Sequence, residues 1–171
     1  MSAPDSSDLR TGPPIHDALL ALLPLVGSWA GTGHGVAPDG AKFEFGQQIR
    51  FVHDGRPFLA YESRAWLLDS GGAVLRQAWR ESGFWRPGAG PDDIEVMLAS
   101  NTGEALLYTG AAGDQRWDIR TASAAHAPTA KQVDAERRLY ALTGDELGYA
   151  SELAPQGRPL APHLNGNLQR A

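Results

Sequence analysis

The chain has 171 residues, a formal net charge of −5 and no cysteine. This length suits one domain with its own hydrophobic core. The absence of cysteine excludes disulfides, thiolate metal sites and cysteine nucleophiles. The acidic charge without a basic stripe argues against nucleic acid as a partner, because nucleic-acid binders carry clustered Lys and Arg.

Membrane segments and export signals are not expected in this sequence. The longest apolar run covers residues 18–26, which is too short to span a bilayer, and Pro24 interrupts it. The N-terminus lacks the basic start and apolar middle of a signal peptide. We therefore expect a cytoplasmic protein that has no membrane partner.

The N-terminal part of the chain contains one helical signal. Residues 1–15 are polar and rich in Pro, Gly and Ser, which predicts a disordered lead-in. Residues 16–23 place their leucines on one broad apolar face and predict a short helix. Pro24 is expected to end this helix or to start the next segment. We expect residues 16–171 to form a single folded domain.

The rest of the chain alternates between apolar and polar residues with the period of β-strands. In residues 42–52, Phe43, Phe45, Ile49 and Phe51 share one parity, and charged or amide side chains occupy the other. This alternation predicts a sheet with one buried face. Turn dipeptides separate this run from similar ones: Asp39-Gly40, Asp54-Gly55, Thr102-Gly103, Gly113-Asp114 and Thr143-Gly144. We predict an all-β, antiparallel β-barrel of about ten strands, because closure leaves no exposed sheet edge.

Residues 25–35 are the most glycine-rich segment, with glycine at positions 27, 31, 33 and 35. A phosphate-binding loop is excluded, because such a loop needs a helix after it and more strand follows here. Glycine in a strand marks a sharp bend or a close approach of two backbones. We interpret the segment as a strongly curled barrel strand whose Trp29 closes one end of the barrel. A direct ligand contact is the alternative.

Several motifs together resemble the nitrobindins, a branch of the fatty-acid-binding-protein-like and lipocalin-like barrels. The first motif is the signature Gly27-x-Trp29-x-Gly31-x-Gly33, and the second is the ending Pro162-His163-Leu164. Further similar runs cover residues 51–61, 81–87, 101–103 and 130–131. The resemblance extends over residues 22–170. It implies the nitrobindin barrel and one b-type haem per chain.

The resemblance implies that His163 is the ligand of the haem iron. A neutral imidazole binds iron through one ring nitrogen, and a single proximal histidine is a common haem ligand. We expect a turn or capping role for His53, which precedes Asp54-Gly55. The remaining histidines show no comparable ligand pattern: His16, His34 and His126.

Strict alternation conflicts with this assignment of His163. The residue shares its parity with Asn165 and Asn167, whereas Leu164 has the opposite parity. The imidazole would then point away from the barrel interior. A site at the open rim or a β-bulge near Pro162 would remove the conflict. The resemblance favours the rim.

Two residues are predicted at the haem edge, where the propionates need cationic or hydrogen-bonding partners. Lys131 matches a family lysine near this edge, and a solvated strand lysine is the alternative. Asp39 departs from the family pattern, since the aromatic-Pro-Thr run of the family reads Ala37-Pro38-Asp39 here. A carboxylate would repel a propionate where threonine would donate to it.

The resemblance further implies that the protein binds nitric oxide and isomerises peroxynitrite to nitrate at the ferric haem. No catalytic side chain is predicted beyond the haem iron, because the iron does the chemistry and the protein holds and shields it. Two alternatives stay open: a haem-free carrier of a lipid or small apolar ligand, and a nitric-oxide sensor without turnover. Both a monomer and a homodimer are compatible with the sequence.

Overall fold

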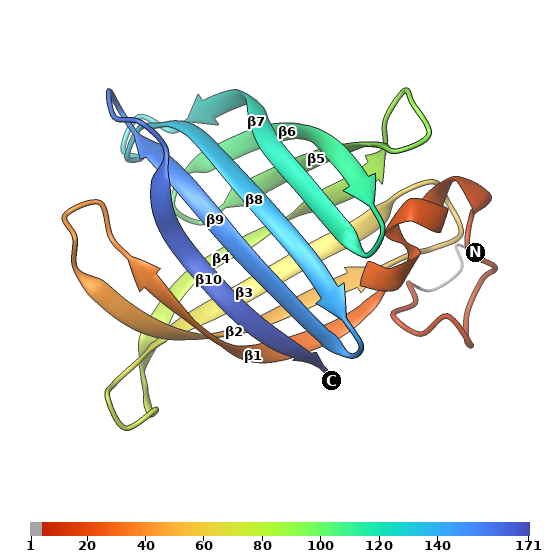
Figure 1. Cartoon of the computed structure of the whole chain (residues 1–171), viewed down its shortest axis with the longest axis horizontal. Helices are drawn as coiled ribbons and strands as arrows, with labels where there is room; N and C mark the ends of the chain where they lie inside the picture. Colours follow the sequence, from red (N-terminus) through yellow and green to blue (C-terminus); the bar gives the residue numbers. More distant parts are fainter. Residues whose placement is uncertain (1–4) are drawn as a thin grey trace.

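The computed structural model describes residues 5–171, and within them ten antiparallel strands form a closed barrel (Figure 1). Each strand pairs with its neighbours in sequence, and β10 pairs with β1 to close the sheet. The predicted all-β, antiparallel barrel of about ten strands is therefore confirmed. The elements are η1 (Asp17–Leu25), β1 (Gly27–Val36), β2 (Lys42–Val52), β3 (Leu59–Leu68), β4 (Val74–Pro87), β5 (Asp93–Ser100), β6 (Glu104–Gly113), β7 (Arg116–His126), β8 (Val133–Thr143), β9 (Glu146–Pro155) and β10 (Ala161–Arg170).

The alternation of the sequence decides which face of each strand is buried. In β2, Phe45, Ile49 and Phe51 are at most 1% exposed, whereas Glu44 and Arg50 are exposed. Successive side chains of a strand point to opposite faces, so the apolar parity lines the barrel interior. The predicted buried face of this segment is confirmed.

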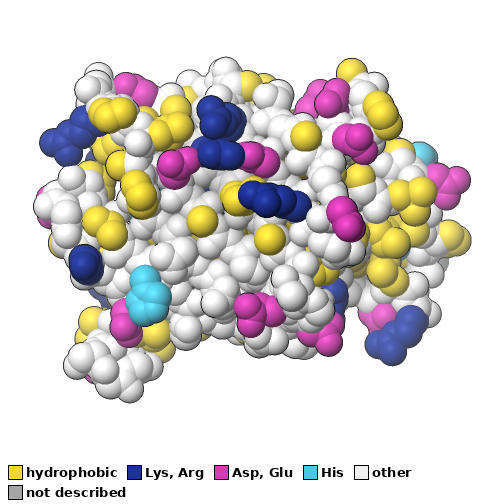
Figure 2. Space-filling view, in the orientation of Figure 1, with side chains coloured by type: hydrophobic (Ala, Val, Ile, Leu, Met, Phe, Trp, Pro, Cys, Tyr) yellow, Lys and Arg dark blue, Asp and Glu magenta, His cyan; other side chains and the backbone are white. Residues whose placement is uncertain are grey.

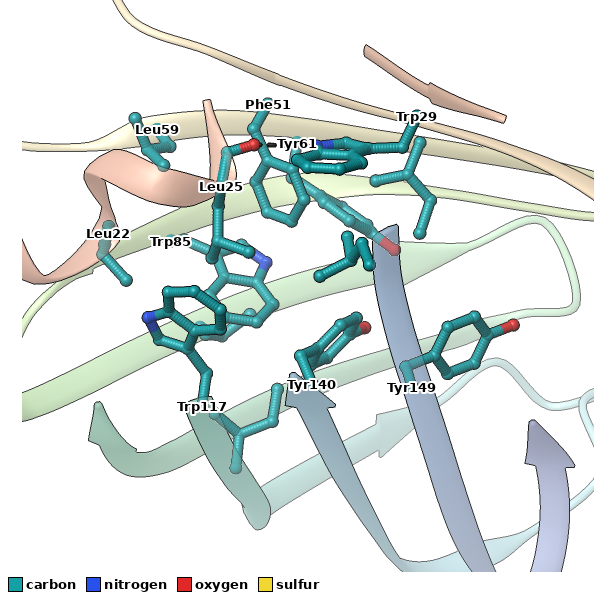
Figure 3. Packing of buried hydrophobic residues seen from close by; sticks show 14 of the residues in the cluster. Leu22, Leu25, Trp29, Phe51, Leu59, Tyr61, Trp85, Trp117, Tyr140 and Tyr149 are labelled. Atoms are coloured by element: carbon teal, nitrogen blue, oxygen red, sulfur yellow. Dashed lines mark hydrogen bonds between the residues drawn. The ribbon is translucent and has the colours of Figure 1, made fainter. Parts of the chain in front are cut away.

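The helix η1 closes one end of the barrel. Its leucines Leu19, Leu22 and Leu25 are at most 1% exposed and pack on a layer of buried aromatic side chains (Figure 3). The indole N–H of Trp29 donates to the carbonyl oxygen of Leu25 at 2.9 Å, and the indole of Trp117 donates to the adjacent turn of η1 at 2.8 Å. The predicted role of Trp29 in closing one end is therefore confirmed.

The N-terminal segment differs from the sequence prediction in two respects. Pro24 does not end the helix, because η1 is a 3₁₀ helix that runs to Leu25 with Pro24 inside it. The N–H of Val26 donates to the carbonyl oxygen of Leu23 and completes the last turn. Part of the expected disordered lead-in also contacts the barrel, where Ser6 forms a β-bridge with His53. Residues 1–4 of that lead-in lie outside the described residues.

The surface carries both signs of charge. On the face shown in Figure 2, basic and acidic side chains are interspersed. Interspersed charges favour solubility and give no continuous basic footprint on this face. Between residues 5 and 171, no helix is long and apolar enough to cross a membrane.

Candidate functional site

The end of the barrel opposite η1 is open and is bordered by hairpin loops (Figure 1). In the described part of the chain, cavities of about 640 Å³ and about 330 Å³ lie at this end. His163, near the start of β10, lines both cavities together with Val36 and Pro162. Cavities of several hundred cubic ångströms are typical of small-molecule and cofactor sites.

A β-bulge sets the position of His163 in β10. In the ladder between β9 and β10, Pro162 lies opposite Glu152. Leu164 lies opposite Ser151, the next residue of β9, so His163 is an extra residue in the ladder. A bulge breaks the alternation of a strand and re-aims the side chain that it contains. The predicted bulge next to Pro162 is thus present at the open rim, and strict alternation does not apply to His163.

A hydrogen bond to β1 orients the imidazole of His163. Its Nδ1 lies 2.9 Å from the backbone carbonyl oxygen of Val36. A carbonyl oxygen only accepts, so Nδ1 of the neutral ring carries the proton and donates it. The other ring nitrogen, Nε2, then holds a free lone pair. Histidines that bind metals usually donate their second ring N–H in this way, which fixes the tautomer and the ring orientation.

Lys42 and Arg158 bring positive charge to the cavities beside His163, and Glu44 and Asp69 bring two carboxylates to the larger one. Lys42 begins β2 and lines the larger cavity, and Arg158 lies in the β9–β10 loop and lines the smaller one. The guanidinium of Arg158 donates to the carbonyl oxygen of Pro38 at 3.0 Å, which ties two rim loops together. Neither Lys42 nor Arg158 is predicted by the sequence, because a charged side chain next to a turn carries no pattern of its own.

An aromatic cluster forms the inner wall of the open end. The ring centroids of Phe45 and Trp79 lie 5.0 Å apart, and those of Phe43 and Trp79 lie 6.5 Å apart. A Cβ atom on Gly33 would lie 2.4 Å from Cζ of Phe45, and one on Gly35 would lie 2.1 Å from Cζ of Phe43. The glycines of β1 therefore leave the space that these rings fill, which confirms their predicted structural role.

The other glycines of the signature also allow close approaches. A Cβ atom on Gly31 would lie 2.1 Å from the backbone oxygen of Asn167 in β10. Gly27 has a φ of +147°, and a Cβ atom there would lie 2.6 Å from a guanidinium nitrogen of Arg170. The glycines of the signature thus allow the close packing at the seam between β1 and β10 and at the closed end. His34 and Gly35 of the same strand line the larger cavity.

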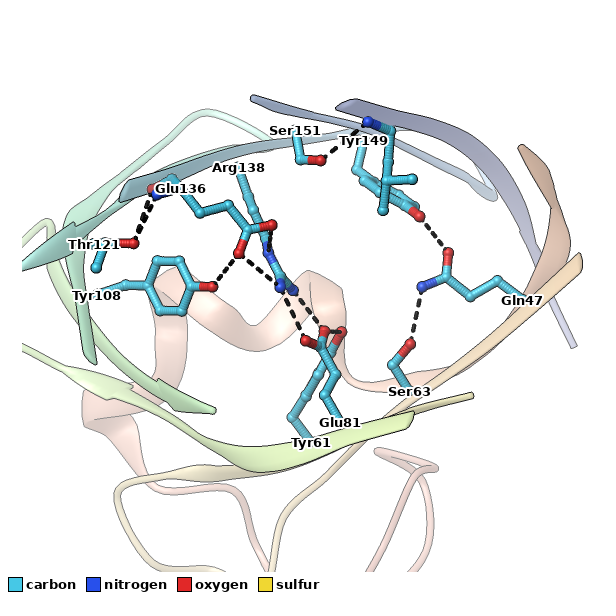
Figure 4. A network of polar contacts seen from close by, with 11 residues as sticks. Gln47, Tyr61, Ser63, Glu81, Tyr108, Thr121, Glu136, Arg138, Tyr149 and Ser151 are labelled. Carbon is cyan, nitrogen blue, oxygen red and sulfur yellow. Dashed lines mark hydrogen bonds and ion pairs between the residues drawn. The ribbon is translucent and has the colours of Figure 1, made fainter. Parts of the chain in front are cut away.

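A buried ionic network crosses the barrel interior below the open end (Figure 4). Nη1 of Arg138 lies 2.5 Å from a carboxylate oxygen of Glu81, and Nε of Arg138 lies 3.0 Å from one of Glu136. The hydroxyls of Tyr61 and Tyr108 donate to Glu81 and Glu136 at 2.8 Å and 2.6 Å. Charged and phenolic side chains therefore occupy the middle of the barrel.

The charges of Glu81 and Arg138 are fixed at neutral pH. Burial raises the pKa of Glu81, but the charge and hydrogen bonds of Arg138 and the hydroxyl of Tyr61 outweigh burial and hold this pKa below its ordinary value. Burial lowers the pKa of Arg138, but the carboxylates of Glu136 and Glu81 raise this pKa well above its ordinary value. Glu81 and Arg138 therefore form a permanent ion pair in the interior.

The two residues predicted at the haem edge lie at the open end without joining His163. Lys131 is exposed in the β7–β8 loop, and Asp39 is exposed in the β1–β2 loop. Neither residue is part of the lining of the two cavities described above. The carboxylate of Asp39 accepts the backbone N–H of Ala41 at 3.0 Å, as in an Asx turn. Their roles at the haem edge stay predictions.

The other histidines have different environments. His34 lines the larger cavity from β1, and its Nδ1 lies 3.7 Å from a carboxylate oxygen of Glu44. His126 accepts the backbone N–H of Val133 through Nε2 at 3.2 Å, a partner that the sequence did not reveal.

The capping role expected for His53 is wrong. The ring of His53 is 1% exposed and has no hydrogen-bond partner among the described residues, since packing against the N-terminal segment buries it.

The groups at the open end fit a b-type haem. His163 offers one imidazole that the carbonyl oxygen of Val36 orients, and a single imidazole is the protein ligand of many five-coordinate haems. Phe43 and Leu164 line the larger cavity with apolar surface, and Lys42 and Arg158 are cations of the kind that propionates require. Nowhere in residues 5–171 do three His, Cys, Asp or Glu side chains gather to hold a bare metal ion. A haem supplies four nitrogen ligands to its iron, so a single histidine is enough to complete this ligation.

A closed antiparallel barrel with a cavity at one open end defines the class of small ligand-binding β-barrels. Within this class, residues 18–170 match the family described as THAP4-like, heme-binding beta-barrel domain. The chain belongs to this family of haem-binding barrels, and the resemblance to the nitrobindins is confirmed.

Named relatives cover nearly the whole chain. A peroxynitrite isomerase of Salinispora arenicola is 45% identical over an alignment of 170 residues, and the match covers 97% of this chain and 87% of the relative. A ferric nitrobindin-like protein of Corynebacterium diphtheriae is 43% identical over 97% of this chain and 74% of the relative. The crystal structure of Rv2717c from M. tuberculosis has a TM-score of 0.81 and 34% identity, and the match covers 92% of this chain and 99% of that one.

Proposed function

We propose that this chain binds one b-type haem through Nε2 of His163 and isomerises peroxynitrite to nitrate. The observation that carries the proposal is the hydrogen bond from Nδ1 of His163 to the carbonyl oxygen of Val36 at 2.9 Å. This bond prepares the opposite ring nitrogen as a ligand. The name of the Salinispora arenicola relative, peroxynitrite isomerase, supports the reaction.

The chain itself holds the cofactor and shapes its surroundings. When bound, ferric haem supplies the iron at which peroxynitrite rearranges and nitric oxide binds. Lys42 and Arg158 would pair with the propionates, because both cations line cavities that His163 also lines. Phe43, Phe45 and Trp79 exclude water from the inner side of the site. No side chain is assigned a role as acid or base.

The buried network disfavours the alternative of a haem-free lipid carrier. A lipid chain in the barrel interior would have to displace the ion pair between Arg138 and Glu81, whose side chains are 12% and 8% exposed. Separating buried opposite charges costs several kcal/mol, on the order of 3–5. The space for a ligand is therefore at the rim, around His163.

His163→Ala is the variant that tests this proposal. We expect the wild-type protein to bind haemin one to one with an intense Soret band and to raise the yield of nitrate from peroxynitrite. His163→Ala should lose the iron–imidazole bond and the nitrate yield while the barrel stays folded. His126→Ala is the matched control, because His126 also lies at the open end but lines neither cavity.

The readouts are a haemin titration, the absorption spectrum and the nitrate yield after peroxynitrite addition. An unchanged Soret spectrum in His163→Ala would reject the ligand assignment. Haemin binding through His163 without any gain in nitrate over free haemin would reject the isomerase activity. That second result, combined with tight nitric-oxide binding, is the outcome expected of a sensor.

A further inference from the structure

Ser151 contacts the backbone of β10 at the bulge that contains His163. The backbone N–H of Leu164, the residue directly after His163, donates to Oγ of Ser151 at 3.2 Å (Figure 4). Ser151 is also the residue that lies opposite Leu164 in the ladder between β9 and β10. Its hydroxyl therefore binds the backbone of β10 at the position where the register shifts.

The bulge explains why the backbone N–H of Leu164 bonds to a side chain. A bulge leaves the extra residue unpaired and disrupts the backbone hydrogen bonds next to it. A buried backbone donor without a partner costs free energy, so a side-chain acceptor in that place stabilises the bulged geometry. Ser151 is 3% exposed, and its backbone neighbour across the next ladder is Arg138 of the buried network. The hydroxyl is thus held in a fixed and dry position.

We infer that Ser151 is a positioning residue for His163. It holds the bulge between Pro162 and Leu164, and this bulge lets Nδ1 of His163 reach the carbonyl oxygen of Val36. Ser151 acts through the backbone and does not touch the ligand itself. The inference rests on the proposed role of His163 as the haem ligand, but its first test needs no haem.

The first test reads the tautomer of His163 in the haem-free protein by ¹⁵N NMR of the histidine side chains. In the wild type we expect a single tautomer with the proton on Nδ1. Ser151→Ala should give a mixture of tautomers, because the bulge relaxes and the bond to Val36 is lost. Ser63→Ala is the matched control, since Ser63 is also a buried serine of the barrel interior but bonds to Gln47, away from the bulge.

The second test measures haemin affinity. Loss of a residue that orients a metal-bound histidine costs about 10- to 100-fold in affinity. We expect Ser151→Ala to weaken haemin binding at least about tenfold at an unchanged number of sites, and Ser63→Ala to weaken it by less than about threefold. Ser151→Thr keeps the hydroxyl and should restore most of the affinity and the single tautomer.

The outcomes separate this inference from the proposed function. An unchanged His163 tautomer in Ser151→Ala overturns the inference, and so does a haemin affinity equal to that of Ser63→Ala. If Ser151→Ala does not fold, Ser151→Thr decides: a single tautomer supports the role of the hydroxyl, and a mixture overturns it. If the wild type fails to bind haemin while the tautomer still depends on Ser151, the proposed function fails and the positioning of His163 stands.

Discussion

Arg137 and Arg138 are neighbours in β8, but they should contribute differently to the free energy of unfolding, because one side chain faces the surface and the other faces the barrel interior. Arg138 points into the barrel and neutralises Glu81 and Glu136, and its side chain is 12% exposed. Arg138→Met leaves two buried carboxylates without a cation, so the free energy of unfolding should fall by about 3–5 kcal/mol. Urea denaturation at neutral pH measures this loss.

The matched control is Arg137→Met, one residue earlier. Arg137 points outward and pairs with Asp118 at 2.6 Å on the surface. Surface ion pairs contribute little to stability, so this variant should unfold close to the wild-type urea concentration. Equal losses of unfolding free energy in Arg138→Met and Arg137→Met would show that the stabilisation by Arg138 does not depend on its burial.

The sequence revealed the identity of the site residue but not what holds it. His163 stands in a recognisable motif with Pro162 and Leu164, so the resemblance that this motif carries predicts its role. The partners of the site are distant in sequence, as in the contact between Arg158 and Pro38, which are 120 positions apart. No local pattern reports such a contact. Ser151, Lys42 and Arg158 could therefore be assigned only with the barrel closed.

At the scale of the strands, alternation predicts the faces well and fails where the register shifts. In β2 the parity read from the sequence agrees with the observed burial from Phe45 to Phe51. In β10 the extra residue at His163 reverses the parity, and a bulge leaves no mark in the alternation itself. The helix η1 showed a similar limit, because a 3₁₀ turn tolerates Pro24 where an α-helix would end.

The seam between β1 and β10 depends on glycine in β1. A Cβ atom on Gly33 would lie 2.2 Å from the backbone oxygen of Asn165 in β10 and 2.4 Å from the ring of Phe45. Gly33→Ala should therefore lower the free energy of unfolding by about 3 kcal/mol or more, at the upper end of overpacking costs, because a backbone atom cannot move aside cheaply. Chemical denaturation monitored by tryptophan fluorescence measures the change.

Gly148→Ala in β9 is the control for this prediction. A Cβ atom there would lie 3.3 Å from Oδ1 of Asn167, a flexible side-chain atom, so the variant should retain most of the stability. A loss in Gly33→Ala no larger than in Gly148→Ala would contradict the view that the glycine signature serves the β1–β10 seam.

The whole molecule has two ends with different tasks. Helix η1 and buried aromatic residues close one end, and the cavities around His163 lie at the other. The ionic network of Arg138 lies between them. A stable closed end and a separate ligand end predict that stability and haem affinity can change independently. Arg170 allows a test of this separation.

Arg170 joins the last strand to the closed end. Its guanidinium carbon lies 4.2 Å from the centroid of the Trp29 ring, and Nη1 donates to the carbonyl oxygen of Val26 at 2.8 Å. Arg170→Ala removes this cation–π contact, the hydrogen bonds to the carbonyl oxygens of Val26 and Pro24, and an ion pair with Asp145. The contacts with Pro24 and Asp145 are exposed to solvent and contribute little, so the total loss should be about 1–2 kcal/mol. For a chain of this length that cost lowers the melting temperature by about 3–6 °C.

Haemin affinity should stay within about twofold of the wild type in Arg170→Ala, because His163 lies at the opposite end of β10. Arg64→Ala, which removes an exposed partner of Glu62, should change neither quantity appreciably. Thermal melting by circular dichroism and a haemin titration on the same samples give both numbers. If the affinity fell in proportion to the melting temperature, the two ends would be coupled through β10. The closed end would then be part of the haem site and not only its scaffold.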